Sequence, residues 1–440
     1  MSTDFIVEVK KFKQKDGVFY FFKKGGQYYA TEHEAEIIAS RYLRSYGSLK
    51  ETTTGVHFVQ IMEQMYISLL RDLLLYDRKS IELYEFDINT WKKAYEASPG
   101  NISSVIDLIN NDLDISKSSL LLALSATNKN GQVYFDAACC DSTLFTIATT
   151  SFLDSSPSLV YYENLINQTM PSEIIFCDIA EPMIQTLTKI TTEYGIPFRQ
   201  SQVKNFKDPG SRFPNTKAVK VLLSSLSINA EEFSHKSFEL TDFMTVDHSA
   251  SNAINIFPED QKNNRGLPTS LYQLLNQCVT PMGSRLLHQF LQQPLLDLQK
   301  IEERLNIVSA FHDHLDVVMS VRDAMRQIPD IARLMRKFKS GRANLQDCVR
   351  MHDIALIIPR VAEIKNVGSE SLAELGAQLE EQEQEGAKIV KLVKQSIDFN
   401  LLPQHIYRIT PEFNDELTQM ANNMNEIRNR MEKICNRIAD

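Results

Sequence analysis

The chain has 440 residues, of which 43% are hydrophobic and 23% charged, a composition typical of soluble globular proteins. This length suggests about two to four domains. The net charge of −9 argues against a protein that binds nucleic acid with its whole surface, although six lysines gather within residues 1–30.

The cysteines and the apolar runs indicate a reducing compartment. None of the six cysteines forms a CxxC pair or another zinc-ligand spacing, so we expect no metal site and no disulfide framework. The sequence shows no apolar leader at its start, and no apolar run approaches the ~18 residues that a membrane span requires. We therefore expect a cytosolic or nuclear protein without a membrane partner.

Residues 1–101 combine aromatic strands with amphipathic helices. VFYFFKKGGQYYAT (Val18–Thr31) predicts two strands around a Lys-Lys-Gly-Gly turn, since a glycine pair favours a tight hairpin. Apolar spacing predicts helices over His33–Tyr46 and Phe58–Asp77, and the run Ser80–Phe86 predicts a strand. Pro99-Gly100 marks a strong break at the end of this region.

Residues 102–265 alternate strands and helices. Two strands, Ser118–Thr127 and Gly131–Cys140, flank an Asn-Lys-Asn-Gly turn, and STLFTIATTSFL predicts a third strand. A helix at Tyr161–Asn167 precedes the compact apolar strand Glu173–Ile179, which the helix Pro182–Tyr194 connects to IPFRQ. Three antiparallel strands followed by a βαβ pattern predict a ribonuclease-H-like α/β layer.

Residues 266–440 predict an all-helical region. Thr280 before Pro281 is an N-cap with proline in the first turn, Pro294 stops that helix, and Asn344 resembles another N-cap. Leu286, Leu287 and Leu305 lie on apolar stripes, so we expect them in the core. Two long charged helices follow, at Ser369–Ile397 and Pro411–Asp440. The apolar residues of the last helix repeat at three and four residues and predict a partner helix.

The stretch from Gly266 to Glu363, which begins GLPTSLYQLLNQCVTPMGSRLLHQFLQQPLLDLQKIEERLNIVSAF, resembles the helical lever of MutS-type mismatch-repair proteins. YEASPGN (Tyr95–Asn101) is similar to the same family. The resemblance implies a mismatch-binding-like domain at 1–101, a ribonuclease-H-like connector at 102–265, and a helical lever that leads into a long clamp helix at 266–440. It further implies a nuclear DNA mismatch-repair subunit that binds double-stranded, mismatched DNA. Its implied partners are a second MutS homologue, in a heterodimer, and a MutL-type protein.

Family members that read mismatches carry a Phe-x-Glu motif on a strand that corresponds to the end of the hairpin. The resemblance places Gln27 and Tyr29 at the Phe and Glu positions, so we expect a subunit whose partner supplies the wedge. The candidate DNA-binding residues are Lys23, Lys24, Gln27, Tyr28 and Tyr29. The alternative for Tyr28 and Tyr29 is a role in strand packing. The cluster Lys10–Lys15 either reaches phosphates or forms a solvated segment.

Two alternatives of other classes stay open. Asp136, Asp141 and Asp178 invite a metal-dependent nuclease hypothesis, although their spacing is loose and strand-end aspartates often serve as turn caps. The second alternative is a helical scaffold or adaptor that docks repair partners without touching DNA. We therefore assign no catalytic and no metal-binding residue.

The sequence contains no GxxxxGK[ST] motif, whose backbone amides and lysine would hold nucleotide phosphates. ATP and magnesium are cofactors of the full-length family, and we expect neither in this chain, which looks like the front half of such a protein. We thus expect no ATP hydrolysis by that mechanism and name no nucleotide-binding residue.

Overall fold

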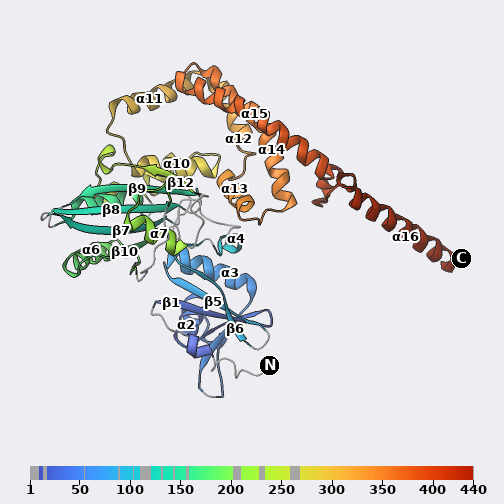
Figure 1. The fold of residues 1–440 in the computed structure, drawn as a ribbon, viewed down its shortest axis with the longest axis horizontal. Helices are drawn as coiled ribbons and strands as arrows, with labels where there is room; N and C mark the ends of the chain where they lie inside the picture. Colours follow the sequence, from blue (N-terminus) through green and yellow to red (C-terminus); the bar gives the residue numbers. More distant parts are fainter. Residues whose placement is uncertain are drawn as a thin grey trace. The chain divides into compact units, whose positions relative to one another are not determined.

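The computed structural model describes residues 9–12, 17–53, 55–87, 90–102, 104–109, 120–129, 132–141, 144–154, 158–201, 210–226, 233–257 and 268–439. The chain forms two compact units, residues 1–275 with 287–296, and residues 276–286 with 297–440 (Figure 1). The first unit contains two mixed sheets with helices, and the second is helical. The predicted fold class, α/β followed by all-α, is confirmed.

The first sheet has the strand order β3-β4-β2-β1-β5-β6. β1 and β2 form the predicted hairpin, and only the β1–β5 pair is parallel among the described strands of this sheet. Its strands are β1 Val18–Lys24, β2 Gln27–Thr31, β3 Leu49–Glu51, β4 His57–Ile61, β5 Ser80–Asp87 and β6 Thr90–Ala97.

Helices cover one face of this sheet. They are α2 Glu32–Ile37, which continues as a π-turn over Ile38–Tyr42, and α3 Glu63–Arg71, which continues as a π-turn over Asp72–Tyr76. The predicted helix Phe58–Asp77 is wrong over its first residues, because Phe58–Ile61 belongs to β4. That segment is rich in aromatic and β-branched residues and pairs on both sides, with β2 and β3, so sheet hydrogen bonds replace a first helical turn.

The second sheet has the order β11-β10-β7-β8-β9-β12. β7, β8 and β9 are antiparallel, while β10 and β11 run parallel to β7, as a ribonuclease-H-like layer requires. β12 adds a parallel edge strand that the sequence patterns did not predict. The strands are β7 Leu120–Lys129, β8 Gln132–Asp141, β9 Thr146–Leu153, β10 Glu173–Cys177, β11 Phe198–Gln200 and β12 Ser234–Ser237. The turn between β7 and β8 lies partly outside the described residues.

Both faces of the second sheet are covered. α5 (Val160–Thr169) and α6 (Glu181–Glu193) pack on one face, and α7 (Lys217–Leu226) packs on the other. β10 is buried at all five positions, because helices lie on both of its sides.

A buried carboxylate ties the two sheets together. Glu173, at the start of β10, is 4% exposed and accepts hydrogen bonds from the Ser98 hydroxyl, from the Gly100 backbone N–H at 3.2 Å and from Arg199 Nε at 2.8 Å. A Cβ atom at Gly100 would meet Leu121 Cδ1 at 2.6 Å, so only glycine fits there. The Pro99-Gly100 break predicted from the sequence is therefore a packed joint.

The second unit consists of helices joined by capped turns. Asn344 forms a full capping box with Asp347, and the Thr280 hydroxyl accepts the Gly283 N–H at 3.1 Å, as predicted. The helices from the end of the first unit onward are α8 His248–Ala253, α9 Leu271–Leu275, α10 Pro281–Gln292, α11 Leu298–Asp313, α12 Leu315–Met325, α13 Ile331–Lys339, α14 Leu345–Val361, α15 Glu370–Ser396 and α16 Asp415–Ala439. Across the described part of the chain, no helix is long and apolar enough to cross a membrane.

The expected core positions in this region are wrong. Leu286 is 49% exposed and Leu305 is 59% exposed, and Leu287 is only half-buried. On α11 the residues that pack against buried neighbours are Ile307, Ala310 and Phe311, so Leu305 lies off the packed face. Apolar periodicity marks a candidate face, whereas burial depends on a neighbouring element that periodicity does not specify.

Candidate nucleic-acid interface

The tip of the β1–β2 hairpin is a two-residue glycine turn. Lys24 pairs with Gln27 across it, and Gly25 and Gly26 have φ values of 59° and 76°. Positive φ at both central positions is the geometry of a type I′ turn, which matches the twist of the strands. The turn therefore projects Lys24 and Gln27 from the sheet at a fixed register.

The two hairpin lysines lie against groups of β5. Lys23 Nζ is 3.0 Å from Glu85 Oε1, and this hydrogen bond raises the pKa of Lys23. Lys24 Nζ lies 4.2 Å from the centroid of the Phe86 ring, a cation–π distance. Lys23 thus carries a charge that Glu85 offsets, which reduces its contribution to attracting a phosphate.

Tyr28 and Tyr29 pack into opposite sides of the sheet. Tyr28 is 6% exposed and stacks on Tyr66 at 4.0 Å between ring centroids, and Tyr29 is 7% exposed beside Phe58. Gln27 is half-buried and accepts a hydrogen bond from Gln60 at 3.3 Å. A tyrosine ring that is already buried and stacked does not offer a face to a base, so the packing alternative for both tyrosines gains support.

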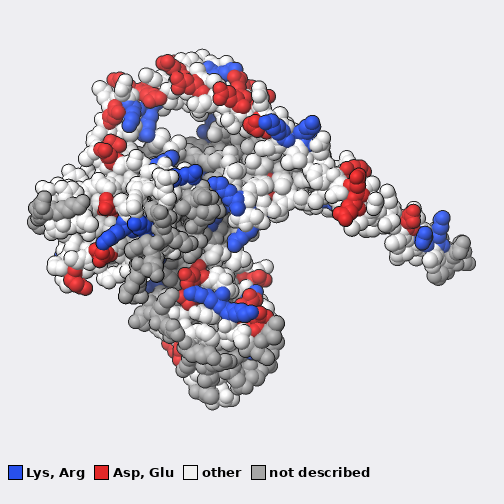
Figure 2. Space-filling model, in the orientation of Figure 1, with Lys and Arg blue, Asp and Glu red and all other residues white. Residues whose placement is uncertain are grey.

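Carboxylates accompany the lysines across the rest of this sheet. Lys92 bonds Asp87, and Lys93 bonds Glu82 and Glu96. Figure 2 shows the resulting mixture of blue and red on the visible face of the region that β5 and β6 form in Figure 1. The Lys10–Lys15 side chains fall largely outside the described residues. The described surface of this sheet is therefore mixed in charge.

The three aspartates of the nuclease alternative contact separate partners. Asp136 accepts a hydrogen bond from the Ser151 hydroxyl at 2.7 Å, Asp141 caps the Leu144 N–H at 3.1 Å, and Asp178 pairs with Lys217. The pKa of Asp178 is lowered by the hydrogen bond from Lys217. Within the described ranges, no group of three or more His, Cys, Asp or Glu side chains is placed to hold a metal ion.

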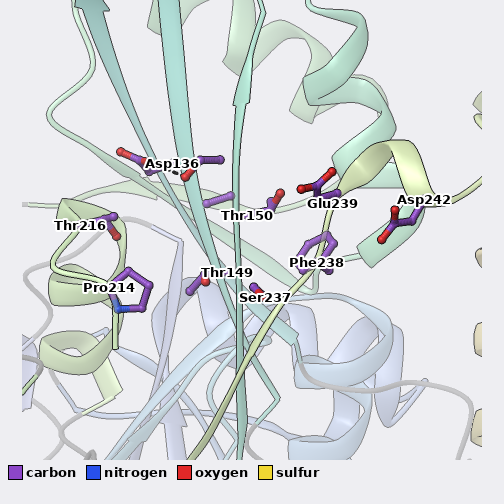
Figure 3. A pocket seen from close by; sticks show the side chains of 11 residues that line it. Asp136, Thr149, Thr150, Pro214, Thr216, Ser237, Phe238, Glu239 and Asp242 are labelled. Atoms are coloured by element: carbon purple, nitrogen blue, oxygen red, sulfur yellow. Dashed lines mark hydrogen bonds between the residues drawn. The ribbon is translucent and has the colours of Figure 1, made fainter. Parts of the chain in front are cut away.

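One of these aspartates lines a recess that the sequence patterns did not reveal. A cavity of about 630 Å³ lies beside β8 and β9, and Asp136, Glu239 and Asp242 supply carboxylates to its wall. Figure 3 shows Asp136 and Thr150 on the strands, with Glu239 and Asp242 on the segment that follows β12. Glu239 and Asp242 follow β12, a short strand that the sequence patterns did not predict. The patterns therefore could not predict that these two carboxylates lie beside Asp136.

Comparison with known proteins gives consistent matches. Residues 249–440 match the model of MutS domain III. The chain is 26% identical to the DNA mismatch repair protein msh-2 of Neurospora crassa, over 93% of this chain and 48% of that protein. It is 28% identical to Msh2 of Dictyostelium discoideum, over 83% of this chain and 44% of that protein. A MutS protein of Rickettsia bellii is 36% identical over 26% of this chain and 12% of its own length.

The helical region matches MutS domain III and follows two α/β layers, so the chain resembles MutS-type proteins. Among these proteins it is similar to Msh2 over most of its length. The chain spans about half the length of the Msh2 relatives that it matches.

Proposed function

We propose that the protein is a DNA mismatch-repair subunit that binds duplex DNA, in the nucleus, as one member of a MutS-type heterodimer. The observation that carries the proposal is the similarity to Msh2 proteins, which extends over 93% of the chain and includes both sheets and the helical unit. We propose no ATP or magnesium site within these residues, because their sequence contains no phosphate-binding GxxxxGK[ST] motif.

Within the heterodimer, this subunit holds the duplex without reading the mismatch. The resemblance aligns Gln27 with the wedging aromatic residue of the family, and the neighbouring Tyr28 is buried against Tyr66. The groups left at the hairpin tip, Lys23, Lys24 and Gln27, can contact phosphate oxygens, and such contacts carry no base information. The partner subunit supplies the base-specific contact.

The proposed domains are 1–101 for duplex contact, 102–265 as a connector and 266–440 as the lever. The family match begins at residue 249, before the proposed lever boundary at residue 266. The match thus includes most of α8, within the proposed connector, as well as α9, within the proposed lever. The connector, with both sheet faces covered, docks partner proteins at its edges and loops, and a MutL-type protein is the proposed partner.

The duplex contact is tested by titrating the full chain with a labelled homoduplex at several salt concentrations. We expect Kd in the range of about 10⁻⁴–10⁻⁶ M and a steep loss of affinity with salt. Lys24→Ala should weaken binding, because one phosphate contact is lost. The slope of the logarithm of the binding constant against the logarithm of the salt concentration should fall in magnitude by about one. Lys189→Ala, an exposed lysine on α6, is the matched control and should leave the slope unchanged.

An adaptor that docks repair partners without touching DNA is the second function to consider. The pairing of Lys23, Lys92 and Lys93 with carboxylates favours it, because paired lysines release fewer counterions. No saturable duplex binding at low salt would support the adaptor and exclude the duplex contact proposed here.

A further inference from the structure

The recess beside β9 has a wall of one charge. Its carboxylates are Asp136, Glu239 and Asp242, and no Lys, Arg or His is among the described residues that line it. The remaining polar lining consists of hydroxyl groups, including those of Thr150 and Ser151. Such a wall attracts a cationic group and repels a phosphate.

Thr150 provides a buried polar group inside this recess. Its side chain is 7% exposed and lines the recess. A hydroxyl can both donate and accept a hydrogen bond, so it can bond a polar group that enters the recess. Thr150 therefore adds a hydrogen-bonding group to the acidic wall.

The recess also lies at an open strand edge. β12 pairs with β9 only from Thr146 to Thr149, and Phe238 N–H donates to Thr149 C=O at 3.1 Å. Because backbone groups of alternate residues face the same edge, those of Ser151 and Leu153 continue it. Within the described part of the chain, no strand pairs with β9 on this side beyond Thr149.

The open edge and the acidic wall are contiguous. Thr149 and Ser151 point to the sheet face that α7 covers, with Asp136, while Thr150 points to the opposite face. A strand added at Ser151–Leu153 would send alternate side chains to these two faces, both of which the recess reaches. Main-chain hydrogen bonds would supply affinity, and the carboxylates would select the side chain.

We propose that the β9 edge and this recess form a docking site for an extended, basic segment of a partner protein. The segment pairs with β9 at Ser151–Leu153 and places an arginine or lysine side chain among Asp136, Glu239 and Asp242. This inference rests on the proposal that the connector docks partner proteins, and it is independent of the hairpin contact with DNA.

The test uses fluorescence anisotropy of the full chain with a short labelled peptide that alternates valine and arginine. Matched peptides carry glutamine or glutamate in place of arginine. We expect saturable binding of the arginine peptide, at least tenfold weaker binding of the glutamine peptide, and no binding of the glutamate peptide. The double variant Glu239→Gln with Asp242→Asn should lose at least tenfold in affinity for the arginine peptide.

The edge is tested separately at Leu153. Leu153→Pro removes an N–H that faces the open side, so the β8–β9 pairing is retained and peptide affinity should fall at least fivefold. Leu153→Ala keeps that N–H and should bind the peptide as the unmodified chain does. Thermal unfolding of each variant shows whether its fold is retained.

Three results would overturn the proposal: no saturable binding of the arginine peptide, equal binding of the glutamate peptide, or an unchanged affinity in the double variant. Duplex binding of the same double variant should equal that of the unmodified chain. A chain that binds duplex but no peptide contradicts only the docking site, whereas one that binds peptide but no duplex contradicts only the DNA contact.

Discussion

Replacement of Glu173 by alanine should destabilise the first unit by about 3 kcal/mol, because it leaves the buried Gly100 N–H without its acceptor and removes a charge-assisted bond to Arg199. Glu173 is 4% exposed, so water does not replace these bonds without opening the joint. Urea unfolding of the full chain, followed by circular dichroism, measures the loss. Glu173→Gln keeps an acceptor oxygen and should lose less.

The control for this experiment is Glu193→Ala, an exposed carboxylate at the end of α6, which should change stability by less than about 0.5 kcal/mol. Hydrogen exchange adds a local measurement, because the Asn101 N–H donates to Ser98 C=O within the same turn. Exchange at Asn101 should accelerate in Glu173→Ala. Equal stability of the Glu173 and Glu193 variants would show that the joint is not held by this carboxylate.

Replacement of Asp347 by alanine should have a comparable effect on the helical unit. Asp347 is 1% exposed, and its carboxylate contacts Lys337 Nζ and Arg350 Nη1, each at 3.1 Å, while it also completes the capping box of α14. Loss of this partner leaves Lys337, whose side chain is 22% exposed, without its carboxylate. We expect destabilisation of about 3–4 kcal/mol in urea unfolding of the full chain.

Asp353→Ala is the matched control on the same helix, because Asp353 is 56% exposed and contacts only the neighbouring His352 among the interactions described. Asp347→Asn retains a side-chain acceptor for the cap, so its stability should lie between those of Asp347→Ala and Asp353→Ala. If Asp347→Ala and Asp353→Ala unfold at the same urea concentration, the buried carboxylate does not stabilise this unit.

Local chemistry in the sequence predicted the features that neighbouring residues determine. The Gly25-Gly26 pair specifies its hairpin turn because few other residues adopt positive φ twice in succession. Asn344 specifies the start of α14 because its side chain satisfies an N–H only three residues away. The second sheet followed from the alternation of apolar runs and turn residues.

Features that depend on distant residues could not be predicted in this way. Glu173 bonds Ser98 and Arg199, which lie 75 and 26 residues away, so the sequence around Glu173 shows only an acid before an apolar strand. Tyr28 and Tyr29 lie on a strand with apolar packing on both sides, which an alternating pattern does not reveal. The acidic recess likewise joins Asp136 to Glu239, and the sequence patterns did not predict β12, the strand that precedes Glu239.

The central claim is that this chain contacts duplex DNA without reading the mismatch. The most direct measurement is the ratio of the Kd values for a homoduplex and for the same duplex with a single mismatch, at low and at high salt. The account predicts a ratio near one under both conditions, with both affinities falling together as salt rises, since phosphate contacts carry no base information. A preference for the mismatch of about tenfold or more that persists at high salt, where phosphate contacts are weakened, would contradict it.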